Sequence, residues 1–169
     1  MAEALLRRRL ELAGLGTEVE VRSAGVLDTG RPAAWQAFDA LAARGLSLEA
    51  HRSNRLTPQL MAATDLILGM AREHVRAAVV AAPEAWPRTY TLKELVRRGG
   101  AVGPRPRAQP LEEWLDRVGA GRRRGELAGD SPDDDIADPV GSDPEVFEAL
   151  AEELDDLLAG LVRLVWGVT

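Results

Sequence analysis

The most regular pattern of apolar and polar positions lies at the C-terminal end of the chain. Ser142-Asp143-Pro144-Glu145 has the spacing of a capping box and places acidic residues in a first helical turn. The polar positions that follow are acidic rather than basic, which disfavours a helix lying on a membrane surface. The pattern therefore predicts a long helix packed on a protein core. Its apolar positions recur at three- and four-residue steps: Phe147, Leu150, Leu154, Leu157, Leu158, Leu161 and Val165.

Shorter helices are predicted upstream from the same spacing and from signals at their ends. Thr57 is an N-cap residue followed by Pro58 at the first helical position, and Thr91-Leu92-Lys93-Glu94 has capping-box spacing. Several of the other predicted helices are followed by a glycine or proline, which is typical of a helix C-terminus. The predicted helices cover residues 1–14, about 33–44, 57 to about 63, 71–82, 91 to about 98, and about 111–118.

Three segments between these helices are predicted to be strands. Residues 19–24 alternate and are rich in β-branched side chains. Residues 65–70 form a short apolar run typical of a buried parallel strand, and residues 88–91 are a weaker candidate. Strands that alternate with helices predict an α/β fold of three layers, in which a short parallel sheet is flanked by helices.

The length of 169 residues predicts a single domain over 1–169. Residues 99–135 are rich in Gly, Pro, Arg and Asp, so we expect a variable, loop-rich insertion within that domain. The acidic run Asp130–Asp135 is expected to be a solvated surface loop.

Composition excludes several classes of function. A net charge of -6 argues against nucleic-acid binding. The chain has no cysteine and only two histidines, His51 and His74, so no metal site and no thiol nucleophile is expected within it. No apolar run reaches the roughly 18 residues that span a bilayer, and no membrane partner is expected. The cytoplasm is the default location.

Asp138 is the candidate for proton chemistry, because it stands before Pro139 at the entrance of the last helix. The alternative is that Asp138-Pro139 is simply turn chemistry.

The chain resembles the low-molecular-weight protein-tyrosine-phosphatase family, through the order and spacing of short blocks over nearly its whole length. The blocks are Met1-Ala2-Glu3-Ala4-Leu5-Leu6-Arg7, Val21-Arg22-Ser23-Ala24-Gly25, Gly30-Arg31-Pro32, His51-Arg52-Ser53, Leu56-Thr57-Pro58, Asp65-Leu66-Ile67-Leu68-Gly69-Met70, Glu73-His74, Leu92-Lys93-Glu94-Leu95 and Asp138-Pro139-Val140-Gly141-Ser142-Asp143.

The resemblance implies hydrolysis of phosphotyrosine in proteins, or of a related phosphomonoester, without metal or organic cofactor. The family's nucleophile is a cysteine in a loop of Cys, five residues and Arg, and it forms a phosphocysteine. Asp138 matches the residue that protonates the leaving oxygen and then activates the hydrolytic water. This chain holds no nucleophile, so it is expected to be inactive as given.

Four further residues match family positions. Ser23 and His51 correspond to residues that brace the phosphate loop, although each is also compatible with an ordinary turn or loop residue. Pro139 and Val140 correspond to the substrate pocket. Val140 stands where many members carry an aromatic side chain, so a more open pocket or a different phosphomonoester is implied.

The resemblance also implies that the family's first strand, which is central in its sheet, and the loop that follows lie before Met1. We expect a start site assigned too late, and translation of the DNA upstream of Met1 tests this. Exposed strand edges would then make the chain unstable, prone to aggregation or rearranged. The alternative is a phosphatase-like module that binds a partner without turnover. Arsenate reduction is disfavoured, because its resolving thiols would lie downstream of the loop.

Overall fold

The computed structural model of the protein describes residues 1–25 and 29–168. Their contacts divide into two units, each built from two stretches of chain. The first unit contains Met1–Arg55 and Asp138–Ala159, and the second contains Leu56–Ala137 and residues 160–168. The expectation of one domain over 1–169 stays a prediction, as does the reading of residues 99–135 as a variable insertion.

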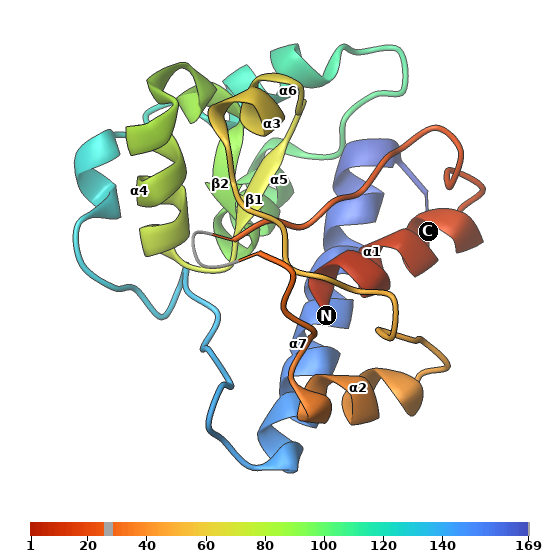
Figure 1. Ribbon diagram of the computed structural model, residues 1–169. Coiled ribbons are helices and arrows are strands. Elements are labelled where there is room, and N and C mark those ends of the chain that lie inside the picture. The colour runs from red at the N-terminus through yellow and green to blue at the C-terminus, as the bar shows by residue number, and fades with distance from the viewer. Residues whose placement is uncertain (26–28, 169) are drawn as a thin grey trace. The chain divides into compact units, whose positions relative to one another are not determined.

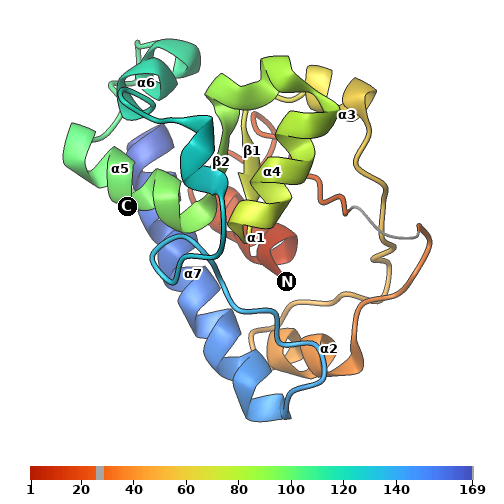
Figure 2. The ribbon, with the colours of Figure 1, turned by 90° about the vertical axis from the view of Figure 1, so that its left-hand side faces the viewer.

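The second unit is built on a parallel pair of short strands. β1 (Ile67–Gly69) pairs with β2 (Thr89–Thr91), and Ile67 lies opposite Thr89. The crossover between them is α4 (Arg72–Ala81) followed by the 3₁₀ turn η1 (Pro83–Arg88). Figures 1 and 2 show both strands between α4 and α5 (Leu92–Val102). The predicted strands at 65–70 and 88–91 are confirmed, within a short parallel sheet flanked by helices.

β2 is fully buried in spite of its polar composition. The Thr89 hydroxyl donates to the carbonyl oxygen of Ala85 at 2.7 Å, and Thr91 Oγ1 accepts the Glu94 N–H at 3.1 Å as the N-cap of α5. The Tyr90 hydroxyl donates to the carbonyl oxygen of Leu115 at 3.0 Å. Burial raises the pKa of Tyr90, against the opposing positive charge of Arg122. Each buried hydroxyl therefore has a partner, which removes the penalty for burying it.

Two apolar clusters pack around α4. Met61, Ala78, Ala82 and Ala85 form one cluster, with Leu56 and Ile67 against it. Val75, Val79 and Leu127 form the other, with Trp86 against it. They join α4 to two further elements of this unit, α3 (Pro58–Ala62) and the 3₁₀ turn η2 (Arg124–Leu127).

α6 (Leu111–Val118) lies within the segment that the sequence describes as loop-rich. Its helix was expected, and Trp114 on it is fully buried. The indole N–H of Trp114 donates to the carbonyl oxygen of Gly103 at 3.0 Å, which satisfies the polar edge of the ring.

The first unit is helical. It contains α1 (Ala2–Leu12), α2 (Trp35–Ala42) and the residues of α7 (Pro144–Trp166) up to Ala159. α1 buries Leu5, Leu6 and Leu10, as its apolar spacing predicts. Arg9 ties α1 to α7 through Asp155, with both N–O distances at 2.7 Å. Among the described helices, none is long and apolar enough to cross a membrane.

The predicted strand at residues 19–24 is wrong. In the described structure these residues form no strand, and the one bridge in the region pairs Gly25 with Arg55. The guanidinium of Arg7 instead donates to the carbonyl oxygen of Val21, at 3.1 Å from Nε and 2.6 Å from Nη2. Alternation and β-branching favour extended backbone, but a strand also needs a neighbouring chain to complete its hydrogen bonds.

Candidate functional site

Asp138 lies in a turn that fixes its carboxylate. Its Oδ1 accepts the N–H of Val140 at 3.0 Å, the pattern by which aspartate mimics a backbone turn. The Ser142 N–H donates to the carbonyl oxygen of Pro139 at 2.9 Å, and Gly141 takes a φ of 87°, which a residue with a side chain rarely adopts. The exposed carboxylate is thus presented to solvent from a defined position just before α7.

The two predicted pocket residues occupy the same turn. Pro139 is half-buried, and the side chain of Val140 is 74% exposed. Such an exposed aliphatic side chain beside a carboxylate could contact a substrate without restricting its shape. The pocket role of both residues stays a prediction.

Ser23 and His51, which are distant in sequence, meet at one carboxylate. The Ser23 hydroxyl donates to Oε2 of Glu3, and Nδ1 of His51 lies 3.7 Å from the same oxygen. Arg7, one turn further along α1, lies 2.6 Å from Oε1 of Glu3. The Glu3 side chain is only 16% exposed, so these contacts form in a partly desolvated place where they are stronger than on an open surface.

Glu3, which joins these residues, was not predicted from the sequence to belong to the site. Its spacing to Arg7 is that of an i, i+4 ion pair, and an acidic residue in a first helical turn suits the helix dipole. Those signals predict a stabilised helix end. They do not predict that two remote loops converge on the same carboxylate.

Asp138 is not brought into this group. Asp138 and this group belong to the first unit, but among the described contacts none joins Asp138 to Glu3, Ser23 or His51. Within residues 1–25 and 29–168, no three His, Cys, Asp or Glu side chains gather closely enough to hold a metal ion. The candidate site consists of a presented carboxylate and a separate cluster of hydrogen-bonding groups.

Comparison with known proteins assigns the family. The profile of the family described as low molecular weight phosphotyrosine protein phosphatase matches residues 1–101. The chain belongs to this family. The α/β fold class expected from the sequence is thereby confirmed.

Three relatives illustrate the match. The low molecular weight protein-tyrosine-phosphatase Etp of Escherichia coli K12 is 34% identical over 116 residues, which cover 68% of this chain and 74% of Etp. A protein-arginine-phosphatase of Geobacillus stearothermophilus is 31% identical over 164 residues, covering 96% and 84% of the two chains. The crystal structure of a low molecular weight protein tyrosine phosphatase from T. tengcongensis matches with a TM-score of 0.69 and 27% identity, covering 96% of this chain and 87% of that one.

Proposed function

We propose that this chain carries the proton-transfer part of a protein phosphatase site, with Asp138 as the general acid. The observation that supports this most directly is the turn in which the Val140 N–H holds Oδ1 of Asp138 at 3.0 Å while the side chain stays exposed. A carboxylate held in place and open to solvent can meet the leaving oxygen of a bound phosphate ester.

Asp138 would act twice in the proposed reaction. As an acid it gives a proton to the leaving atom while the phosphoryl group passes to a cysteine thiolate. The leaving atom is the phenolic oxygen of phosphotyrosine, or the guanidine nitrogen of phosphoarginine. As a base it then takes a proton from the water that hydrolyses the phosphocysteine, releasing phosphate and restoring the thiolate. Ser23 and His51, gathered on Glu3, would act as positioning residues that brace a phosphate-binding loop.

The thiolate for this reaction is not among the 169 residues, because the sequence contains no cysteine. We therefore expect the chain by itself not to hydrolyse an aryl phosphate such as p-nitrophenyl phosphate above background. The second candidate function, a module that binds a phosphorylated partner without turnover, follows from the same absence.

The substrate would be a phosphorylated protein, with phosphotyrosine or phosphoarginine as the modified residue. The E. coli relative is named for tyrosine, whereas a relative that covers 96% of this chain is named for arginine. Val140 is short and 74% exposed, so it offers no aromatic surface on which a phosphotyrosine ring could stack. This favours testing phosphoarginine beside phosphotyrosine.

The test uses the chain extended upstream in frame, provided that this extension encodes Cys, five residues and Arg. Asp138→Asn keeps the acceptor for the Val140 N–H but removes the transferable proton, so kcat should fall by roughly 10²–10⁴. Asp143→Asn is the matched control, because Asp143 is exposed in the same stretch and should leave kcat unchanged.

An unchanged rate in Asp138→Asn would show that the acid is another group. An in-frame stop immediately upstream, together with binding but no hydrolysis of a phosphotyrosine or phosphoarginine peptide, would favour the binding module.

A further inference from the structure

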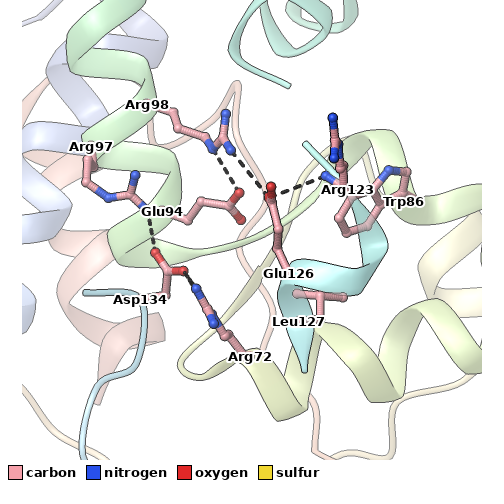
Figure 3. A pocket seen from close by; sticks show the side chains of 9 residues that line it. All are labelled: Arg72, Trp86, Glu94, Arg97, Arg98, Arg123, Glu126, Leu127 and Asp134. Carbon is pink, nitrogen blue, oxygen red and sulfur yellow. Dashed lines mark hydrogen bonds and ion pairs between the residues drawn. The ribbon is translucent and has the colours of Figure 1, made fainter. Parts of the chain in front are cut away.

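A concave site lies wholly in the second unit and shares no residue with the candidate site described above. It is a hollow of about 220 Å³ lined by Arg72, Trp86, Glu94, Arg97, Arg98, Arg123, Glu126, Leu127 and Asp134. Figure 3 shows its charged side chains facing one another from α4, α5, η2 and the 131–135 loop. Four arginines and three carboxylates line the hollow, so one positive charge is left over.

Two of the three carboxylates are firmly held. Asp134 accepts from Arg72 at 2.7 and 2.9 Å and from Arg97 at 2.5 Å, and its side chain is 9% exposed. Glu94 receives two bonds from the buried Arg122, at 2.7 and 2.9 Å, and is 10% exposed. These two acids are integral to the structure, because removing either would leave a guanidinium without its partner.

Glu126 is held much more loosely. Its side chain is 51% exposed, and its Oε2 lies 3.8 Å from Nη2 of Arg98. The same oxygen accepts the backbone N–H of Arg123 at 3.3 Å. Figure 3 shows these two donors converging on the carboxylate. An exposed pair at such distances contributes little free energy, so this carboxylate can leave its position at small cost.

We propose that the position taken by the Glu126 carboxylate is an anion-binding site for a phosphate group, and that Glu126 is its built-in competitor. When Glu126 turns outward, four arginines and two carboxylates remain around the hollow, and the excess of two positive charges matches a phosphate dianion. Nε of Arg98 lies 3.0 Å from Oε1 of Glu94, so Arg98 offers its Nη2 group to a phosphate oxygen. The Arg123 N–H supplies a second donor.

The direct test is a titration of the 169-residue chain with inorganic phosphate at pH 8, with sodium chloride at equal ionic strength as the reference. The resonances followed by NMR are Nε–H of Arg98, the backbone N–H of Arg123 and the indole N–H of Trp86. We expect saturable shifts with phosphate and none with chloride. A phosphoserine peptide titrated in the same way shows whether the group is recognised free or on a chain, through which of the two probes binds more tightly.

Charge variants separate this site from general electrostatic attraction. Glu126→Gln removes the competing charge and should tighten the apparent Kd for phosphate by about two- to fivefold, the range expected from loss of one weak ion pair. Glu112→Gln makes the same charge change at an exposed position of α6 outside the hollow and should tighten it far less. Arg98→Gln should abolish saturation, whereas Arg107→Gln, at an exposed position that does not line the hollow, should not.

The proposal is overturned if phosphate and chloride shift the three resonances alike, or if Glu126→Gln and Glu112→Gln have equal effects. Neither result depends on the catalytic role of Asp138, so this test and the test of the proposed function are independent of each other.

Discussion

Asp134 is buried although it belongs to a run of acidic residues. The sequence predicts that the acidic run 130–135 is a solvated loop, yet Asp134 within it is only 6% exposed. Its neighbour Asp135 accepts the backbone N–H of Arg72 at 2.7 Å, so it completes the start of α4. The expectation of a solvated run is wrong for both residues. Their partner Arg72 lies more than 60 residues away in sequence, so the composition of the acidic run alone could not predict these contacts.

The pKa of Asp134 reflects its surroundings. Burial alone would raise it, but the hydrogen bonds and positive charges of Arg72 and Arg97 outweigh burial and hold the pKa below its ordinary value of 3.8. A carboxyl with a depressed pKa stabilises the folded state when it is ionised. That contribution is fully present above about pH 5 and is lost as the pH falls through 3.8 toward the lower folded value.

Asp134→Asn should therefore destabilise the protein at neutral pH and much less in acid. The amide keeps the shape but turns an N–H₂ group toward an arginine, and we expect a loss of about 1–3 kcal/mol at pH 7, because Arg97 is half-exposed and screened. Urea unfolding followed by tryptophan fluorescence at pH 7 and pH 3 measures it. Asp133→Asn, exposed and adjacent, is the control and should change stability by less than about 0.5 kcal/mol at either pH. An equal loss at both pH values would contradict the electrostatic account.

At the scale of elements, α5 contains two adjacent glycines with opposite surroundings. A Cβ on Gly99 would lie 3.0 Å from Cη2 of Trp114 and 3.2 Å from Cδ1 of Leu164. A Cβ on Gly100 would meet nothing within 4 Å. The indole of Trp114 is fully buried and hydrogen-bonded to Gly103, so it has little freedom to move away. The small residue at position 99 lets α5 and α6 approach closely.

Gly99→Ala should accordingly destabilise the protein, and Gly100→Ala should stabilise it. Alanine gains about 0.5–1 kcal/mol over glycine inside a helix. At position 99 overpacking of about 1–3 kcal/mol outweighs that gain, whereas at position 100 the gain is unopposed. Thermal unfolding of the two variants against the parent chain decides it. If both substitutions raise Tm equally, then Trp114 can shift and the close approach is not required.

The helices were predictable because their signals are local. Thr57 and Thr91 act as N-caps in the structure as the sequence predicts, accepting backbone N–H groups at 3.2 and 3.1 Å. The predicted span 111–118 coincides with α6. The strand at 19–24 failed because strand formation depends on a partner that the segment itself does not encode. The signals of a helix lie within its own residues, whereas a strand forms only where the fold supplies a neighbour, as it does for β1 and β2 and not for residues 19–24.

The candidate site likewise has a part that local sequence predicts and a part that depends on contacts between distant residues. Asp138 and its turn follow from Asp, Pro and Gly within four positions, and the structure places a hydrogen-bonded turn there. The meeting of Ser23 and His51 at Glu3 spans 48 residues of sequence, from position 3 to position 51, and requires the folded first unit. The arginine-lined hollow was not predicted, because its lining residues come from α4, η1, α5, η2 and the loop that contains Asp134.

At the scale of the molecule, the short sheet leaves β1 with a neighbouring strand on one side only. In the described part of the second unit β1 pairs with β2 and with no other strand, and Ile67 and Leu68 are half-buried. Directly after β1, the carbonyl oxygen of Met70 accepts the Ile136 N–H at 2.8 Å, so the strand itself is the part left without a second neighbour. The strands of a parallel sheet are usually covered on both faces. An open edge presents unpaired N–H and C=O groups that a second chain can complete.

We therefore expect the 169-residue chain to self-associate through the edge of β1 as its concentration rises. Sedimentation velocity should show a growing oligomer fraction, and hydrogen exchange should show the amides of Ile67–Gly69 becoming more protected over the same concentration range. Leu12→Lys provides the control, because Leu12 is 78% exposed on α1 and its apolar surface could also cause association. If strand pairing is the cause, Leu12→Lys leaves both measurements unchanged. A chain that stays monomeric, or whose association disappears in Leu12→Lys without any change at β1, would show instead that the edge of β1 is not the contact.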